Sequence, residues 1–153
     1  REKGFSEQLA KHEGYELVGV YHSEGDREKA ANIMQDLLTK YPDLKGVFMT
    51  NEGSSAGVCM TLAQENRKDI VAVGDDSSEE LINNIYSGTM TALVSQNPYG
   101  LGYNSVKAAI ETIKGTAKFE DVTESEFYII DSSNIHTPEM IKVLDPLGTL
   151  KLK

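Results

Sequence analysis

The sequence is poor in the residue types that redox centres and metal sites need. It holds one cysteine, Cys59, and three histidines among 153 residues. A single thiol cannot form an internal disulfide, and among its apolar neighbours Cys59 is typical of a buried small hydrophobic residue. His12, His22 and His136 are scattered without the spacing of metal ligands. We therefore expect no metal and no cofactor.

Basic residues and long apolar runs are also scarce. Lysine and arginine number 15 against 24 aspartates and glutamates, which gives a formal net charge of −9. Nucleic-acid binding depends on cationic side chains that neutralise phosphates, so this balance argues against nucleic acid as a partner of this segment. No apolar run approaches the roughly 20 residues of a membrane-spanning helix.

The motifs of common enzyme classes are missing. There is no P-loop, no glycine-rich dinucleotide fingerprint and no nucleophile elbow with a base. A carboxylate pair for acid–base chemistry would have to be Asp75 and Asp76, which follow a predicted strand, and neighbouring residues at the end of a strand point in opposite directions. Such a pair is poorly placed to act on one substrate atom. The sequence therefore predicts a protein that is not an enzyme.

Strand and helix patterns alternate along most of the chain. Apolar residues at helical spacing, with capping residues in front of them, predict helices over residues 1–12, 27–39, 54–66, 77–88 and 98–114. Short apolar or β-branched runs predict strands over residues 16–21, 46–50, 70–73, 90–94 and 127–130. A short helix or turn is expected over residues 138–142.

Strands as apolar as residues 70–73 are typical of a parallel sheet that helices cover on both faces. With connections of a few residues, the alternation predicts an α/β fold with a doubly wound parallel sheet. Ligands of such sheets bind beyond the carboxyl ends of the strands. The loops to inspect are residues 21–26, 51–55, 74–78 and 95–97.

Four motifs in these loops and at the start of the chain carry a resemblance to a known family. Residues 1–5 fit R-x-x-G-F, residues 47–57 fit a strand followed by an asparagine and a small-residue helix, and residues 71–78 resemble the V-V-G-F-D motif. Residues 85–103 closely match I-x-x-G-x-x-x-A-x-V-x-Q-N-P-Y-x-M-G-Y. Together the matches cover about residues 1–135. In this order they resemble the C-terminal half of a type I periplasmic sugar-binding protein of the ribose-binding kind, whose lobes have a Rossmann-like fold.

The resemblance implies four ligand-binding residues, namely Arg1, Asn51, Asp76 and Gln96. Their chemistry suits a sugar, because a carboxylate accepts from hydroxyls, a guanidinium donates, and a carboxamide does one of each. From the residues alone each has a simpler interpretation. Arg1 fits a surface helix, Asn51 and Asp76 fit helix caps, and Gln96 fits the exposed end of a strand.

Two positions depart from the family pattern. Asp75 stands where the V-G-F-D motif has phenylalanine, and Gly25 stands where ribose receptors carry an aromatic residue that stacks on the sugar. Tyr21 is a nearby alternative aromatic, although ordinary strand packing explains it equally well. These departures put ribose itself in doubt as the ligand.

The resemblance also implies an organisation into lobes. Residues 1–96 would form the C-terminal ligand-binding lobe, residues 97–133 would complete an N-terminal lobe, and residues 134–153 would return to the C-terminal lobe. The chain then begins within a longer protein, and the helix over residues 98–114 lacks its sheet. Self-association or a swap of that helix would cover its apolar face, which carries Val106, Ala109, Ile110 and Ile113.

The implied function is the solute-binding component of a carbohydrate ABC importer. Its partners would be a small sugar and a membrane permease, with a chemoreceptor as a further candidate. The location would be the periplasm, or the outer side of the membrane through a lipid anchor. A second hypothesis is the effector-binding domain of a lactose-repressor-type regulator. The run at residues 87–93 lacks the proline-rich stretch typical of those regulators, which favours the transporter.

Overall fold

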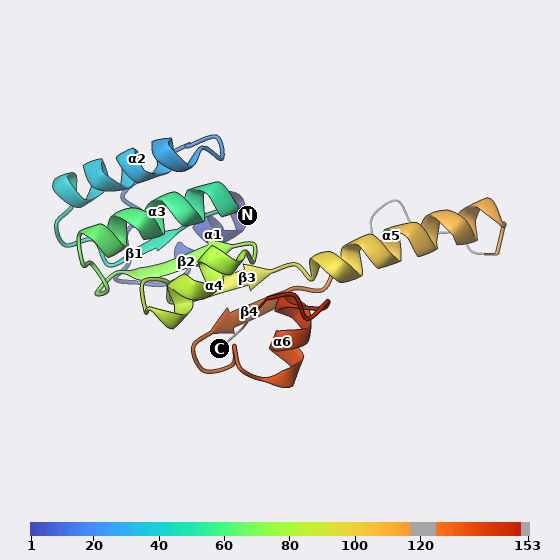
Figure 1. Cartoon of the computed structure of the whole chain (residues 1–153). Helices are drawn as coiled ribbons and strands as arrows, with labels where there is room; N and C mark the ends of the chain where they lie inside the picture. Colours follow the sequence, from blue (N-terminus) through green and yellow to red (C-terminus); the bar gives the residue numbers. More distant parts are fainter. Residues whose placement is uncertain (117–124, 151–153) are drawn as a thin grey trace. The chain divides into compact units, whose positions relative to one another are not determined.

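The chain forms two compact units, Arg1–Leu93 and Val94–Lys153, in a computed structural model that describes residues 1–116 and 125–150. From α2 onward the first unit alternates helices and strands in the order that the sequence predicts (Figure 1). Its elements are α1 (Glu2–Leu9), α2 (Arg27–Lys40), β1 (Gly46–Phe48), α3 (Glu52–Gln64), β2 (Val71–Asp75), α4 (Glu79–Tyr86) and the first half of β3 (Ala92–Ser95).

The centre of the first unit is the parallel pair of β1 and β2. Gly46 pairs with Val71, Val47 with Ala72 and Phe48 with Val73. The amide of Met49 then donates to the carbonyl oxygen of Val73 at 2.9 Å, so the pairing continues beyond the end of β1. On the other side of β2, the amide of Thr91 donates to the carbonyl oxygen of Ala72 at 2.8 Å. The α/β class with parallel pairing is confirmed.

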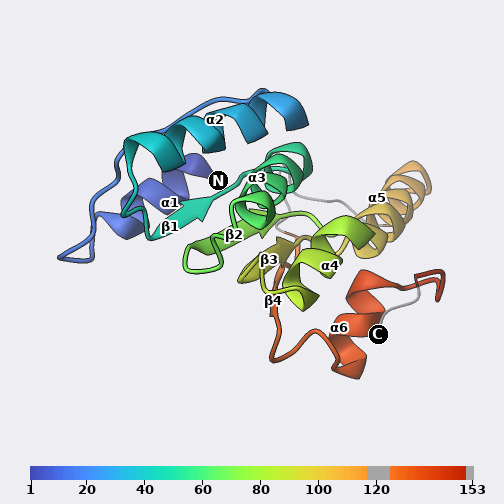
Figure 2. The same cartoon turned by 60° about the vertical axis from the view of Figure 1, so that its left-hand side comes forward.

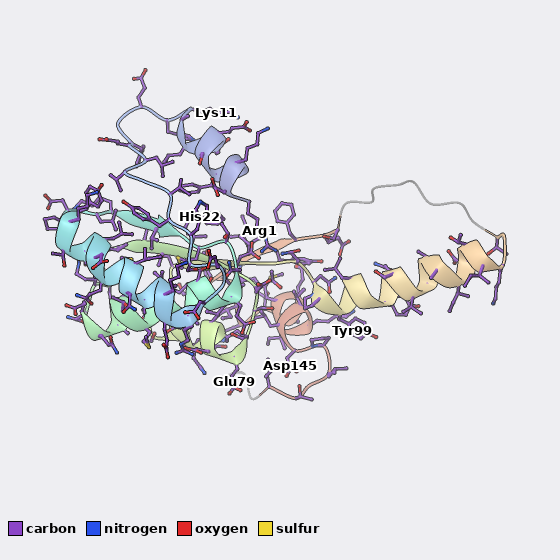
Figure 3. All side chains as sticks on the ribbon, turned by 90° about the horizontal axis from the view of Figure 1, so that it is seen from above. Arg1, Lys11, His22, Glu79, Tyr99 and Asp145 are labelled. Atoms are coloured by element: carbon purple, nitrogen blue, oxygen red, sulfur yellow. The ribbon has the colours of Figure 1, made fainter. Side chains whose placement is uncertain are left out.

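Helices cover the two faces of this sheet unequally. Figures 1 and 2 show α2 running beside α3 over one face, and Figure 3 shows α1 on the opposite side of the strands. The ring of Phe5 on α1 stacks on Phe48 of β1, with centroids 4.9 Å apart. The core of this unit includes side chains from α2, α3, α4, β3 and the residue before β2 that are at most 2% exposed, namely Met34, Cys59, Leu62, Ile70, Leu81, Ile82 and Leu93.

The second unit contains the end of β3, α5 (Pro98–Ile113), β4 (Tyr128–Asp131) and α6 (Pro138–Leu144). In the strand order β4 is the neighbour of β3. Asn97 caps α5 in a left-handed conformation, with φ of 49°, and its side chain accepts from the amide of Gly100 at 3.0 Å. The left-handed Gly115, with φ of 67°, follows the helix, a conformation that glycine commonly adopts just after a helix end.

The predicted strand over residues 16–21 is wrong. The segment is extended, but none of the backbone hydrogen bonds found among the described residues joins it to β1. It borders an apolar cleft of about 1090 Å³, which Phe5, Val47, Phe48 and Val71 also line. The β-branched pattern indicates apolar residues that favour an extended backbone. A strand also needs a hydrogen-bonded neighbour, and the pattern does not show whether one exists. The same cleft leaves one face of β2 partly open, with Val71 52% exposed.

The start of α3 also differs from the prediction. The helix begins at Glu52, two residues before the predicted Ser54, because Asn51 serves as its cap. The amide oxygen of Asn51 accepts from the backbone N–H of Ser54 at 2.9 Å. A cap satisfies one of the N–H groups that the first turn of a helix leaves unpaired. The other predicted helices agree with the structure to within a few residues at their ends.

The close contact between α2 and α3 requires a glycine at position 57. A Cβ at Gly57 would collide with the backbone carbonyl oxygen of Arg27, and it would lie 2.9 Å from the methyl group of Ala30. We expect Gly57→Ala to lower the free energy of unfolding by about 1–3 kcal/mol, because two packed helices must move apart. Urea denaturation followed by circular dichroism measures this change.

The matched control is Gly102→Ala in α5, where an added Cβ meets nothing within 4 Å. Alanine is the better helix former, so this change should leave stability unaltered or raise it by up to about 1 kcal/mol. Equal unfolding midpoints for Gly57→Ala and the parent chain would contradict the close packing of α2 on α3.

Candidate functional site

The candidate site lies at the carboxyl ends of β1 and β2. Since these strands are parallel and in register, the loops that follow them leave the sheet at the same edge. Asn51 follows β1, and Asp76 follows β2. The hydroxyl of the buried Ser55 links the two loops, because it donates to the carbonyl oxygen of Asn51 at 2.8 Å and accepts from the amide of Asp75 at 3.3 Å.

Asn51 is held by the cap that it forms on α3. Its side-chain oxygen accepts from the backbone N–H of Ser54 at 2.9 Å and from the hydroxyl of Ser54 at 3.0 Å. That hydroxyl is also within 2.8 Å of the Ser23 hydroxyl, which lies in the loop before α2. Within the described residues no partner is found for the side-chain NH₂ group of Asn51. The half-buried side chain thus engages its oxygen with the described residues and leaves its two N–H donors unengaged by them.

Asp76 turns its carboxylate toward the start of α3. Its backbone is left-handed, with φ of 73°, a conformation that aspartate adopts more readily than most residues. One carboxylate oxygen, Oδ2, accepts from the backbone N–H of Glu52 at 3.1 Å. The positive end of the helix dipole favours a carboxylate at this place. The other oxygen, Oδ1, has no partner within the described part of the chain.

Arg1 reaches both loops from the first residue before α1. Its Nη1 donates to the carbonyl oxygen of Thr50 at 2.6 Å, and its Nε lies 3.1 Å from Oδ2 of Asp75. The Asp75 side chain is only 5% exposed, whereas that of Arg1 is 40% exposed. The guanidinium therefore has an inner side on the protein and an outer side toward solvent.

The loop of residues 23–26 packs directly on the first turn of α3. A Cβ at Gly53 would collide with the carbonyl oxygen of Gly25, so the two backbones touch. Gly25 itself has a φ of 77°, which favours glycine. Asp26 ends the loop and caps α2 by accepting from the amide of Lys29 at 2.7 Å. This wall of the site is thus made of backbone and small residues.

Tyr21 does not supply an aromatic surface to this site. It lies beside Tyr41 and Lys40 at the C-terminal end of α2, where a side-chain hydrogen bond to Tyr41 raises the pKa of Tyr21. Asp26 and the site lie at the other end of that 14-residue helix. At 1.5 Å per residue the separation along the helix is about 20 Å.

Three of the four predicted residues are thereby brought together. Arg1 touches the residues next to Asn51 and Asp76, and Asp76 binds the residue after Asn51. Gln96 belongs to the second unit, where it follows β3 and is half-buried, and its side chain is not free of interactions. The sequence did not reveal that Asp75 pairs with Arg1; its one signal was a carboxylate at an otherwise apolar strand end.

The described residues contain neither a cluster of metal ligands nor an exposed thiol. Among residues 1–116 and 125–150 no group of three or more histidine, cysteine, aspartate or glutamate side chains could hold a metal ion. Cys59 is fully buried, as predicted, and burial raises the pKa of its thiol to about 12. No helix within the described ranges has the length and hydropathy needed to cross a bilayer.

The cap of Asn51 can be tested by its effect on stability. We expect Asn51→Ala to lower the free energy of unfolding by about 1 kcal/mol, because the amide of Ser54 loses its acceptor. Asn51→Ser keeps a capping oxygen, so it should lower the free energy of unfolding by at most a few tenths of that value. Urea titrations of the three proteins measure both changes, and equal losses in the two variants would contradict the capping role.

Comparison with protein families gives one match of large extent. The profile described as "Periplasmic binding protein domain" matches residues 1–117. The chain is similar to the ribose import binding protein of Salmonella typhimurium, with 30% identity over 115 residues that cover 75% of this chain and 38% of the relative. It is similar also to the D-allose-binding periplasmic protein of Escherichia coli, with 27% identity over 86% of this chain and 43% of the relative.

Solved structures show the same similarity. An ABC transporter solute binding protein from Agrobacterium vitis with bound D-fucose superposes with a TM-score of 0.88 and 28% identity, over 94% of this chain and 50% of that structure. A carbohydrate transporter solute binding protein from Agrobacterium radiobacter, in complex with D-arabinose, gives a TM-score of 0.88 at 29% identity, over 94% and 49%. The chain thus spans half or less of the length of these proteins.

Proposed function

The chain belongs to the periplasmic binding protein domain family, and from this premise we propose that it supplies one lobe of the solute-binding component of a carbohydrate ABC importer. The observation that carries the proposal is the group of Arg1, Asn51 and Asp76 at the carboxyl ends of β1 and β2. The similar proteins named above bind ribose, allose, D-fucose or D-arabinose by their own names and titles.

The proposed ligand is a small sugar, held by Arg1, Asn51, Asp76 and Gln96. Each hydroxyl of a sugar is both a donor and an acceptor. The outer oxygen of Asp76 offers an acceptor, while the NH₂ group of Asn51 and the outer side of the Arg1 guanidinium offer donors. Hydrogen bonds to charged groups contribute about 1.5–3 kcal/mol each, so a few of them support firm binding when water is excluded.

The loop of residues 23–26 offers no aromatic side chain that would select a particular sugar by stacking. The loop of residues 23–26 presents the backbone of Gly25 and no aromatic ring, and Tyr21 lies at the far end of α2. Without a ring, the apolar face of a sugar has no stacking surface in this loop. We therefore propose a monosaccharide as the ligand, without a preference for ribose.

The role that we propose for the whole protein is the one that the family resemblance implies. We propose that residues 1–96 form the C-terminal ligand-binding lobe, residues 97–133 complete an N-terminal lobe, and residues 134–153 return to the first lobe. The whole protein would act without catalysis outside the cytoplasm, either free in the periplasm or lipid-anchored. It would deliver its sugar to a membrane permease, with a chemoreceptor as a further partner. No observation favours the alternative of a repressor's effector-binding domain.

Calorimetric titration of the full-length protein tests the proposal. A panel of pentoses, hexoses and small polyols should contain at least one sugar that binds tightly. Asp76→Ala should weaken that binding by about tenfold or more, because a charged acceptor is lost. Asp36→Ala on the exposed face of α2 is the matched control and should leave the affinity unchanged.

The possible results separate the parts of the proposal. Failure of every sugar to bind the unmodified full-length protein would overturn the sugar-binding function. Tight binding that Asp76→Ala leaves unchanged would show instead that the site lies elsewhere on a true sugar receptor.

A second part of the proposal concerns α5, whose apolar residues lie on the surface. The helix has no buried residue, and Val106, Ile110 and Ile113 are 61%, 45% and 85% exposed. Their spacing of four and three residues places them along one stripe. Such a stripe marks a surface that another protein element covers. We propose that it belongs against the rest of an N-terminal lobe in the whole protein.

The isolated 153-residue chain should therefore self-associate through this stripe. We expect light scattering at micromolar concentration to give a mass above that of one chain, and Val106→Glu with Ile110→Glu to restore the monomer. Lys107→Glu, on the same helix and outside the stripe, is the charge control and should not. A monomeric parent chain would contradict self-association and leave the sugar-binding proposal untouched.

A further inference from the structure

The ion pair between Arg1 and Asp75 has a consequence for ligand choice. We infer that Asp75 is a positioning and selectivity residue, whose buried carboxylate orients Arg1 and compensates its charge so that the site favours neutral sugars over acidic ones. The inference rests on the proposed function, since it concerns the ligand of the same site. The V-G-F-D motif of the family carries phenylalanine where this chain has Asp75.

The geometry fixes the plane of the guanidinium from two directions. Asp75 lies on the Nε side at 3.1 Å, and the carbonyl oxygen of Thr50 accepts from Nη1 at 2.6 Å. Both anchors lie on the protein side of Arg1, so the plane cannot turn without loss of one of them. Nη2 has no partner within the described residues and remains available on the exposed side. Arg1 thus presents a few donors in a set orientation, which suits a hydroxyl group.

The arrangement is poorly suited to a carboxylate ligand. A guanidinium grips a carboxylate with two parallel N–H donors, and one of the edges that can do this runs from Nε to Nη2. Asp75 stands on the Nε side of that edge. A carboxylate from a ligand would have to compete with a protein carboxylate that is only 5% exposed and cannot move into solvent.

The charges around Arg1 also disfavour an acidic ligand. Asp75 balances the positive charge of Arg1, and Asp76 follows it directly with a second carboxylate that accepts from the amide of Glu52. Among these three side chains, the carboxylates therefore outnumber the cation. Like charges at close range repel most strongly where water is excluded, as it is around a bound ligand. An acidic sugar would meet this repulsion, whereas a neutral sugar would not.

A purely structural role explains Asp75 less well. A buried carboxylate is costly to desolvate even when it is paired, and an apolar residue of similar size at the end of an apolar strand avoids that cost. Arg1 is 40% exposed and would remain solvated without Asp75. Toward Arg1, the carboxylate adds a defined position and a balancing charge.

The test is a double-mutant cycle on the full-length protein. Titration calorimetry with D-ribose, D-arabinose and D-fucose as neutral probes, and with D-galacturonate and D-glucuronate as acidic probes, gives a preference ratio for each variant. We expect Asp75→Asn to weaken neutral binding about tenfold, the size of one charge-assisted contact. The ratio of neutral to acidic affinity should fall by at least tenfold, because the charge of Arg1 is then exposed to the ligand.

The cycle is completed in the Arg1→Ala background. If Asp75 acts through Arg1, Asp75→Asn should change neither the affinity nor the preference ratio there by more than about twofold. Additive effects in the two backgrounds, or an unchanged preference ratio in Asp75→Asn, would overturn the inference. A role in folding alone would alter the unfolding temperature but not the preference ratio, which separates the two explanations.

A second variant covers the case in which Asp75→Asn does not fold. Arg1→Lys keeps a cation beside the buried carboxylate but cannot reach Asp75 and Thr50 from one planar group. Neutral affinity should fall about tenfold, and unchanged affinity would overturn the positioning role. Absence of sugar binding by the unmodified protein would overturn the proposed function itself, a result distinct from either failure of Asp75.

Discussion

The parallel pairing of β1 with β2 is the constraint on which the candidate site depends. The register from Gly46–Val71 to Phe48–Val73 ends both strands at one edge of the sheet. That common edge puts the first turn of α3 beside the loop after β2, so Asp76 can accept from the amide of Glu52. Parallel strands always bring carboxyl ends together, and here each end continues into a capped helix. A shift in register would separate the loops and remove the site.

The cap by Asn51 and the left-handed Asp76 both satisfy unpaired backbone N–H groups in the first turn of α3. The first turn of α3 leaves backbone N–H groups without partners, and these attract oxygen atoms. Asn51 satisfies one of them from the β1 side, and Asp76 satisfies another from the β2 side. The Ser55 hydroxyl ties the same two loops together beneath the surface. The contacts with the first turn of α3 therefore orient the polar residues of the candidate site.

Much of this arrangement could be predicted from the sequence, for physical reasons. Helical spacing and capping residues identify α2, α4 and α5, because those patterns arise within one element. The placement of Asn51 and Asp76 after neighbouring strands follows from the parallel sheet. The segment of residues 16–21 was mispredicted because its pattern cannot show whether a pairing partner exists. The Arg1–Asp75 pair was missed because it joins residues 74 positions apart, which no local pattern records.

The site residues each divide their polar atoms between the fold and the outside. Asn51 uses its oxygen on α3 and keeps its NH₂ group, Asp76 uses Oδ2 and keeps Oδ1, and Arg1 uses Nε and Nη1 and keeps Nη2. The fold thus fixes the orientations of these three side chains before a ligand binds. This reduces the entropic cost of ordering them on binding. Two sets of donors and one acceptor remain, and they complement a molecule whose groups both donate and accept. That balance supports the proposed neutral sugar ligand, and it follows from the contacts that hold the loops in place.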